Sequence, residues 1–469
     1  MTTALTAYID SHRVGQFTTD GRRIAFTFDD EWRRGARRME LSLSMPKSRR
    51  HHEGDAPANF LWNLLPDSEP VLERWGQKFH VSPRNPLALL EHVGMDTAGA
   101  VQLSVHDAPT LDATGGTEPI STAEIATHIR QLRDDPEAWL IAGHGDGYFS
   151  LAGAQSKFAL ARIVDGWAVP TGRAPSTHIF KPGIRGLDRG DLNEHLSLSA
   201  AGRLGLEVAG SMIERFEDET VIVVDRYDRA IVADGAVRRI HQEDMAQAAG
   251  IHPSVKYQNQ GGPGIEQVTQ IIRSARGRDR ESAERFFEAV LFNWAALGTD
   301  AHAKNYSLLH SASDGPRLAP LYDITTALPY PDINTRTAKL AMSFKKHYLQ
   351  HEIEPRHILE EAARSGFDGE WVRAQASRIV EGLADAYSDA ASDADLAGGG
   401  TEFAARITDA AAERAALLRR ELNRADGTVV AGTADARLAT SQPRRKTTPA
   451  SNAGSFAKRR NSPPSGALG

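Results

Sequence analysis

The stretch "LGTDAHAKNYSLL" (residues 297–309) gathers an aspartate, a histidine, a lysine and an asparagine between apolar residues. Asp300 and Asn305 stand five positions apart. A phosphotransferase loop has this spacing when its aspartate accepts the proton of a hydroxyl group and its asparagine binds magnesium. Because so short a pattern arises often by chance, it predicts a kinase-like fold only if the rest of the chain supplies the other parts of a phosphoryl-transfer site.

Other kinds of site compete for the same residues. Asp300, His302 and His310 permit a zinc or iron site, but a second well-spaced group of histidines and acids is missing, and mononuclear catalytic sites usually need three protein ligands. A serine hydrolase would need a G-x-S-x-G elbow, and a P-loop NTPase would need G-x-x-x-x-G-K-[ST]; neither accompanies this stretch. His302 and Lys304 are therefore expected to shape the loop and neutralise phosphate charge.

Composition narrows the class of protein. The chain has 469 residues, 41% of them hydrophobic and 25% charged, which is typical of globular proteins with two or three domains. The absence of cysteine excludes disulfides, thiolate metal sites and cysteine nucleophiles. The net charge of −6 predicts no global nucleic-acid surface. We expect a cytoplasmic protein without membrane association, because neither a secretory signal nor a run of about 18 apolar residues occurs.

The carboxyl-terminal end differs from the rest of the chain. Residues 437–469 contain seven lysines and arginines, no acid, and many Ser, Pro, Gly and Thr residues. Such a segment lacks the apolar residues that a core needs, so we expect a solvated, disordered tail. Weak electrostatic contact with nucleic acid is the alternative.

Hydrophobic periodicity divides the chain into a strand-rich half and a helix-rich half. The expected domains are an amino-terminal unit, a strand-rich lobe ending in a hinge, a helical lobe and the basic tail, at residues 1–106, 122–229, 230–424 and 425–469. Strands are expected at 24–32, 39–46, 138–142, 157–163, 167–170, 177–182 and 220–229, and helices at 191–213, 282–297, 355–364, 369–391 and 402–424. This order predicts an α+β, two-lobed architecture.

A phosphate cradle is expected in "GYFSLAGAQSKFAL" (147–160). Small residues let backbone N–H groups approach a polyphosphate closely, and they are Ser150, Ala152, Gly153 and Ala154. A plain hairpin loop is the alternative.

A positive side chain is expected from Lys181, which ends the apolar strand in "THIFKPG". Glu194, in the following helix, is a candidate to position it; a surface lysine is the alternative.

Asn305 and Asp323 are the candidate magnesium ligands. Asp323 interrupts the apolar stretch "RLAPLYDITTALPY" (317–330). An acid in such surroundings is costly to bury unless it is paired or binds a metal. Capping of a turn is the structural alternative.

Six motifs together resemble the HipA family of toxin kinases from bacterial type II toxin–antitoxin modules. They are "SLAGAQSKFAL", "THIFKPG", "VVDRYDR", "IHQEDMAQAAGIHPSVKYQNQGGPG", "GTDAHAKNYSLL" and "LAPLYDITTA". The resemblance extends in order from about residue 1 to residue 424, since "MELSLSMP" and "NFLWNLLPDS" are similar to the amino-terminal part of that family.

The resemblance implies a protein-kinase-like fold, ATP and Mg²⁺ as cofactors, and phosphorylation of a protein serine. Asp300 would be the catalytic base, Asn305 and Asp323 the magnesium ligands, and Lys181 the lysine on the ATP phosphates. The hinge would place Asp225 and Tyr227 beside adenine; Asp225 is one methylene shorter than the glutamate often found there. Ser150 matches the autophosphorylated serine of the family and would act as an off-switch.

The resemblance also implies partners. A HipB-like helix-turn-helix antitoxin would neutralise the kinase and link it to operator DNA, and the protein substrate would be an aminoacyl-tRNA synthetase such as glutamyl-tRNA synthetase, so that translation and growth are inhibited. Two alternatives remain: a catalytically idle pseudokinase that acts as an antitoxin-bound co-repressor, and a kinase for a small molecule or lipid.

Overall fold

The computed structural model describes most of the chain. The described residues are 4–35, 39–105, 115–141, 143, 149–184, 186–232, 236–275, 280–311, 315–335, 337–394, 396 and 400–439, with only the backbone for 425–439. A compact unit extends as far as Asn423. All of the site described below lies within this unit.

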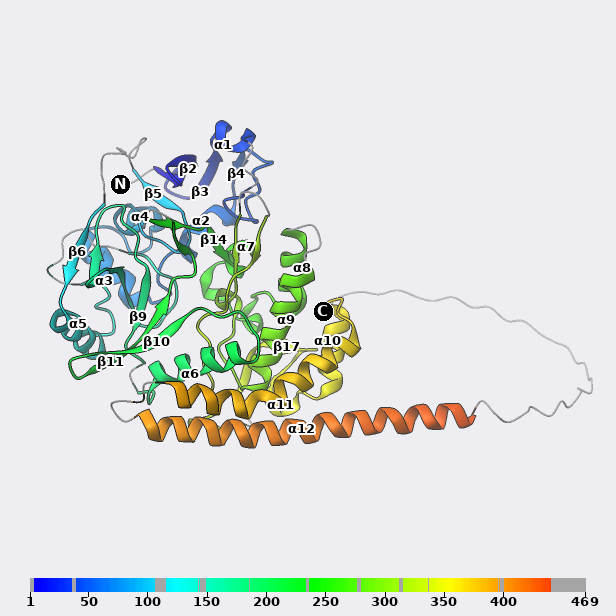
Figure 1. The fold of residues 1–469 in the computed structure, drawn as a ribbon. Helices are drawn as coiled ribbons and strands as arrows, with labels where there is room; N and C mark the ends of the chain where they lie inside the picture. The colour runs from blue at the N-terminus through cyan, green and yellow to red at the C-terminus, as the bar shows by residue number, and fades with distance from the viewer. Residues whose placement is uncertain are drawn as a thin grey trace, which may run out of the picture. The chain divides into compact units, whose positions relative to one another are not determined.

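The amino-terminal region, residues 4–105, combines an antiparallel sheet with four helices, three of which contact the sheet in the described residues. The sheet has the strand order β4-β3-β2-β1-β5, and its strands are β1 (Ala4–Ile9), β2 (His12–Thr19), β3 (Ile24–Phe28), β4 (His51–His52) and β5 (Gln102–Ser104). The helices are α1 (Asp30–Arg34), α2 (Asp55–Asn63), α3 (Glu69–Phe79) and α4 (Pro86–Val93). Figure 1 shows α2 beside α7 of the helical lobe, and the Asp67 N–H donates to the Gly153 oxygen at 3.0 Å, so this region borders both lobes.

The strand-rich lobe is a six-stranded antiparallel sheet of order β10-β11-β9-β7-β8-β6. Its strands are β6 (Thr117–Ile120), β7 (Phe158–Ile163), β8 (Gly166–Pro170), β9 (His178–Lys181), β10 (Ser211–Phe216) and β11 (Glu219–Asp225). Helices α5 (Thr122–Asp134) and α6 (Gly190–Arg203) pack beside it. The aromatic rings of Phe158 and Phe180 stack 4.8 Å apart between β7 and β9. This contact and the pairing of β9 with β11 set the position of Lys181, the last residue of β9.

The helical lobe surrounds a large apolar core. Its helices are α7 (Met245–Ala249), α8 (Ile265–Ala275), α9 (Arg280–Ala295), α10 (Pro355–Arg364), α11 (Gly369–Asp393) and α12 (Gly400–Ala439), with short 3-10 turns η1 (Pro253–Val255), η2 (Gln258–Gln260), η3 (Ala303–Asn305) and η4 (Gln350–Glu352). Small strand pairings accompany them: β12 (Arg229–Ile231), β13 (Val237–Arg239), β14 (Gln242–Asp244), β15 (Ser307–Leu309), β16 (Arg317–Leu318), β17 (Lys339–Phe344) and β18 (His347–Leu349).

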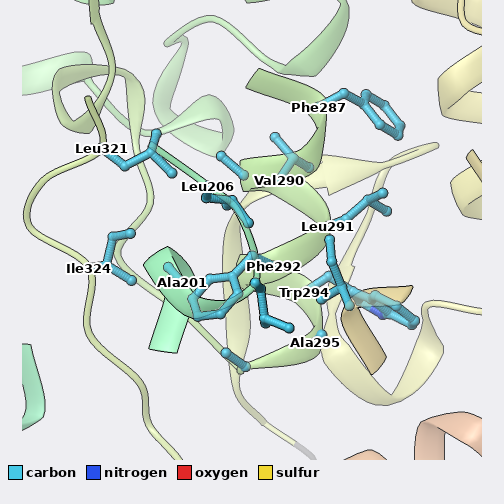
Figure 2. Close-up of a cluster of buried hydrophobic side chains, with 14 of the residues drawn as sticks. Ala201, Leu206, Phe287, Val290, Leu291, Phe292, Trp294, Ala295, Leu321 and Ile324 are labelled. Atoms are coloured by element: carbon cyan, nitrogen blue, oxygen red, sulfur yellow. The ribbon is translucent and has the colours of Figure 1, made fainter. Parts of the chain in front are cut away.

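Helix α9 lies at the centre of that core. Figure 2 shows Val290 of α9 beside Leu206 and Phe292 beside Ala201 of α6, so this core also includes side chains from α6 and the turn after it. Almost every residue of α9 from Phe286 onward is buried. A helix that is apolar on most of its faces is stable only inside a protein. Because α9 ends directly before residues 297–309, this core fixes the base of the loop that carries Asp300.

The expected α+β, two-lobed class is confirmed, but four expected elements differ. The strand expected at 24–32 ends at Phe28, because Asp29 caps helix α1. Residues 39–46 form no strand beyond an isolated bridge between Ser42 and Met45. Residues 138–141 form no strand either, because Trp139 is buried edge-to-face against Trp75. The helix expected at 191–213 ends at Arg203, since Gly205 takes a left-handed conformation (φ +83°) that stops it, and β10 follows.

The expected boundary at residue 424 lies within a helix. Helix α12 begins at Gly400 and continues to Ala439, so it extends across that boundary, whereas the compact unit ends at Asn423, beside it. Residues 440–469, which hold most of the basic side chains of the expected tail, lie outside the described residues. In the described part of the chain no helix has both the length and the apolar content that crossing a membrane requires.

Candidate active site

A cavity of about 890 Å³ brings together residues that are far apart in the sequence. Those expected at a phosphoryl-transfer site that border it are Ala152, Gly153, Ala154, Lys181, Glu194, Asp225, Tyr227, Asp300, His302, Lys304, Asn305 and Asp323. Ser150 is the exception, because it is fully buried and does not border the cavity. The cavity is therefore built from both lobes, and the amino-terminal region contributes Asn63 and Ala98.

Lys181 lies between two carboxylates. Its ammonium nitrogen is 2.6 Å from Glu194 Oε1 on α6 and 2.9 Å from Asp323 Oδ1. Burial alone would lower the pKa of Lys181, but the two carboxylates outweigh it and raise the pKa. Lys181 thus stays charged at the cavity wall. Its ion pair with Glu194 is the contact that the sequence led us to expect.

The small-residue segment lies against the amino-terminal region. The Ser150 hydroxyl donates to the carbonyl oxygen of Leu64 at 2.7 Å, and the Ser150 side chain is fully buried. Gly153 adopts a φ of +102°, and a Cβ there would come within 2.6 Å of Lys157 Nζ. Glycine is therefore favoured by the backbone conformation, whereas the contact with Lys157 is with the end of a flexible side chain that can shift. The beginning of the expected cradle, residues 147 and 148, lies outside the described residues.

Asp300 and Asn305 occupy one loop. The side-chain amide of Asn305 donates to the backbone oxygen of Asp300 at 2.8 Å, which links the two residues directly. Asp300 keeps an exposed face toward the cavity, while the protein packed around its other side removes water and raises its pKa. The hydroxyl of Tyr257 donates to Asp300 Oδ1. A carboxylate with a raised pKa at a cavity wall is a suitable proton acceptor.

Histidines of this region do not assemble around Asp300. Burial lowers the pKa of His302 to about 4, so its ring is neutral. His310 is buried against Glu243, with Nε2 and Oε1 2.9 Å apart. Among the residues that the structure describes, no group of three His, Cys, Asp or Glu side chains is arranged to hold a metal ion.

The expected magnesium ligands both border the cavity. Asp323 has a φ of +56°, a conformation that costs a non-glycine residue energy and is concentrated at functional sites. Burial would raise the pKa of Asp323, but Lys181 and Lys157 lower it well below its usual value, so the carboxylate is charged. Asn305 donates through Nδ2, which leaves its amide oxygen for a cation. An ionised carboxylate and an amide oxygen are ligands that suit Mg²⁺ bound with phosphates.

The hinge segment Asp225–Arg229 has two faces. Asp225 is half-exposed and lies 3.0 Å from His178 Nε2, while Tyr227 is inside the cavity, donates to Gln242 and packs 5.4 Å from the ring of Tyr322. The side chains of Arg226 and Arg229 are buried in an ionic cluster with Asp96 and Asp228. The pattern "VDRYDR" signalled the hinge, but nothing in it showed that Asp96, more than a hundred residues earlier, pairs with its arginines.

Three further charged residues, Asp67, Lys256 and Lys157, were missed by sequence reasoning. Asp67 follows α2 and lies 2.8 Å from Lys256 Nζ and 3.8 Å from Lys304 Nζ. Lys304 is mainly engaged by Asp244, at 3.0 Å, so its charge is already compensated within the protein. Lys157 borders the cavity, and burial together with Lys181 lowers its pKa to about 8. A lysine at the start of a strand after a small-residue loop was the available signal for Lys157.

Comparisons with known proteins agree with this arrangement. Residues 149–391 match the model of the HipA-like C-terminal domain, and residues 5–104 match that of the HipA N-terminal domain. The chain is similar to Y4mE of Sinorhizobium fredii, a protein named as a kinase, at 34% identity over 82% of this chain and 91% of the relative. It is also similar to the serine/threonine-protein kinase toxin HipA of Shewanella oneidensis, at 28% identity over 79% of this chain and 84% of the relative.

A solved structure has the same fold. It is the complex of HipA, HipB and operator DNA from a Shewanella oneidensis toxin–antitoxin system, with a TM-score of 0.78 and 23% identity, covering 90% of this chain and 98% of the solved chain.

Proposed function

Because the chain belongs to the HipA family, whose described relatives include a serine/threonine-protein kinase toxin, we propose that it transfers the γ-phosphate of ATP to a serine of a cellular protein. The observation that carries the proposal is the convergence of Lys181, Asp300, Asn305 and Asp323 on one cavity from three separate parts of the sequence. An idle pseudokinase would not need to keep all four.

Each residue has a distinct role in this proposal. Lys181, held by Glu194, binds the ATP phosphates, and the backbone of residues 152–154 approaches them. Asp300 accepts the proton of the acceptor hydroxyl as the oxygen attacks phosphorus. Asn305 and Asp323 would hold Mg²⁺, which supplies neutralisation of phosphate charge when it is bound.

The adenine end of ATP would lie at the hinge. Asp225, Arg226 and Tyr227 border the cavity between the two lobes, and the ring of Tyr227 offers an apolar surface for a base. His302 is neutral and supports Tyr257 rather than carrying charge, since the rings meet edge-to-face at 4.9 Å. Lys304 contributes structure at the cavity wall, because Asp244 already compensates its charge.

Ser150 is proposed as an off-switch set by autophosphorylation. A phosphate on Ser150 would carry close to two negative charges. It has no room beside the Leu64 carbonyl, to which the buried hydroxyl now donates. The segment would have to move outward, and the phosphate-binding backbone of residues 152–154 would leave the cavity with it.

The partners follow from the family. A HipB-like helix-turn-helix antitoxin would bind and neutralise this chain and link it to operator DNA; the similar solved structure contains HipA with HipB and its operator DNA. The protein substrate would be an aminoacyl-tRNA synthetase such as glutamyl-tRNA synthetase, whose phosphorylation would stop translation and growth.

The test is phosphate transfer from radiolabelled ATP by the purified full chain, alone and with cell lysate, beside the Asp300→Asn variant. Labelling of a lysate protein by the wild type alone is expected, together with phosphate on Ser150 by mass spectrometry. Labelling of lipid or a small molecule instead would show a different substrate class, and no transfer to any acceptor would indicate a pseudokinase. Ser150 phosphate on Asp300→Asn, expressed without another copy, would show that a different enzyme sets the switch.

A further inference from the structure

Asp300 is oriented by one side chain of its own protein. The Tyr257 hydroxyl donates to Asp300 Oδ1, and the Tyr257 ring is set edge-to-face on His302. The other carboxylate oxygen, Oδ2, accepts no hydrogen bond from any residue that the structure describes, and the Asp300 side chain is exposed at the cavity. A carboxylate turns easily about its Cβ–Cγ bond, so engagement of one oxygen selects the direction of the other.

The segment that carries Tyr257 is held firmly against the loop of Asp300. The backbone oxygen of Lys256 accepts from the Ala303 N–H at 3.3 Å. A Cβ at Gly262 would come within 2.6 Å of the Val255 oxygen and 2.7 Å of the Lys256 oxygen, so the chain folds back on itself here with no room for a side chain. Tyr257 therefore meets Asp300 from a fixed support.

The amino-terminal region supplies the outer anchor of this segment. Asp67 Oδ2 is 2.8 Å from Lys256 Nζ, and both side chains are largely buried. Lys256 and Lys304 outweigh the effect of burial and lower the pKa of Asp67, so its charge is retained. The backbone N–H of Asp67 also donates to the Gly153 oxygen at 3.0 Å. One residue of the amino-terminal region thus contacts both the small-residue segment and the support of Tyr257.

We infer that Tyr257 is a positioning residue for Asp300 and that Asp67, through Lys256, holds Tyr257 in place, so that the amino-terminal region completes the active site. With Oδ1 engaged by Tyr257, Oδ2 is directed to the acceptor hydroxyl. The inference rests on the proposed phosphotransfer and specifies how its base is oriented. Loss of orientation at a reacting group is known to slow chemistry without weakening substrate binding.

The experiment compares Tyr257→Phe and Asp67→Asn with matched controls in the full chain. Tyr348→Phe changes a tyrosine of β18 that does not border the cavity, and Asp29→Asn changes the residue that caps α1, where asparagine also caps well. Turnover of MgATP, with water or protein as acceptor, and the Kd of a fluorescent ATP analogue are measured. Each test variant should lower kcat by about tenfold and leave Kd within about twofold, whereas the controls should change neither.

A double mutant distinguishes positioning from general weakening. Tyr257→Phe should cause no further loss in an Asp300→Asn background, because the group that it orients is gone. An equal fold-loss in both backgrounds, a parallel loss of ATP affinity, or an unchanged kcat would overturn the inference. A raised kcat in Tyr257→Phe would overturn it too, because the tyrosine would then be a competitor of the acceptor hydroxyl. A wild type without turnover would instead overturn the proposed function. If Asp67→Asn does not fold, Tyr257→Phe, which removes a single oxygen atom, still tests whether Tyr257 positions Asp300.

Discussion

Replacing Lys181 by methionine should make the stability of this protein depend steeply on pH. Glu194 has a side chain 1% exposed, and its pKa is raised by burial even while Lys181 lies 2.6 Å away. Without that partner, the buried carboxyl would take up a proton on folding rather than stay charged. Asp323 would be affected less, because it is 32% exposed and retains Lys157 nearby.

The magnitude follows from the ordinary glutamate pKa of 4.5. A carboxyl that must be protonated in the folded state costs about 1.4 kcal/mol for each pH unit above that value. The penalty in Lys181→Met is therefore at most about 3.4 kcal/mol at pH 7 and about 1.4 kcal/mol at pH 5.5. The sign is fixed because a folded state that binds more protons than the unfolded state loses stability as the pH rises.

The assay is urea unfolding followed by circular dichroism at pH 5.5, 6.2 and 7. The difference in unfolding free energy between wild type and Lys181→Met should widen as the pH rises. The double variant Lys181→Met/Glu194→Gln should recover most of the loss at pH 7 and remove the pH dependence, because no buried group then has to bind a proton. A pH-independent difference, or a double variant no more stable than the single one, would refute the reasoning.

Three further predictions concern ligands and the chain end. Asn305→Ala and Asp323→Ala should each lower magnesium-dependent ATP turnover by at least about a hundredfold with an unchanged circular dichroism spectrum, because each removes an oxygen ligand; turnover near the wild-type rate in both would exclude the assigned metal ligands. ATP binding at pH 8.5 should be accompanied by uptake of part of a proton, because Lys157, with a pKa of about 8, is mostly neutral until the phosphates favour its charged form. Calorimetry in two buffers of different ionisation enthalpy measures this proton uptake, which should vanish in Lys157→Arg. Truncation after Asn423, where the compact unit ends, should leave the melting temperature and ATP turnover unchanged; a truncated chain that fails to fold would place the boundary further along.

Local sequence patterns were sufficient for the architecture and the family. The spacing of Asp300 and Asn305, the apolar strand ending at Lys181 and the single acid in 317–330 each depend on a few neighbouring residues. Such short-range patterns survive in the linear sequence, because strand and helix periodicity and loop chemistry are local properties. The confirmed α+β, two-lobed fold and the HipA relationship both rest on them.

Local sequence patterns predicted the wrong structure for several segments of the chain. Residues 39–46 alternate as strands do and residues 138–141 form a short apolar run, yet neither segment forms a strand. Burial of Trp139 and packing against distant segments outweigh a weak local preference. Glycine at position 205 was present in the sequence, but only its left-handed conformation shows that the helix of Glu194 ends before it.

Tertiary structure alone decided which charges meet. Asp96 pairs with Arg226 and Arg229 across more than a hundred residues, and Asp67 reaches Lys256 across nearly two hundred. No local periodicity predicts such pairs, since each carboxylate would be equally stable in water beside any other cation. The ion pairs form because the fold buries both partners together, and a buried charge without a partner is costly. The sequence therefore determined which groups are able to perform the chemistry, whereas the fold determined that the amino-terminal region stands beside Asp300.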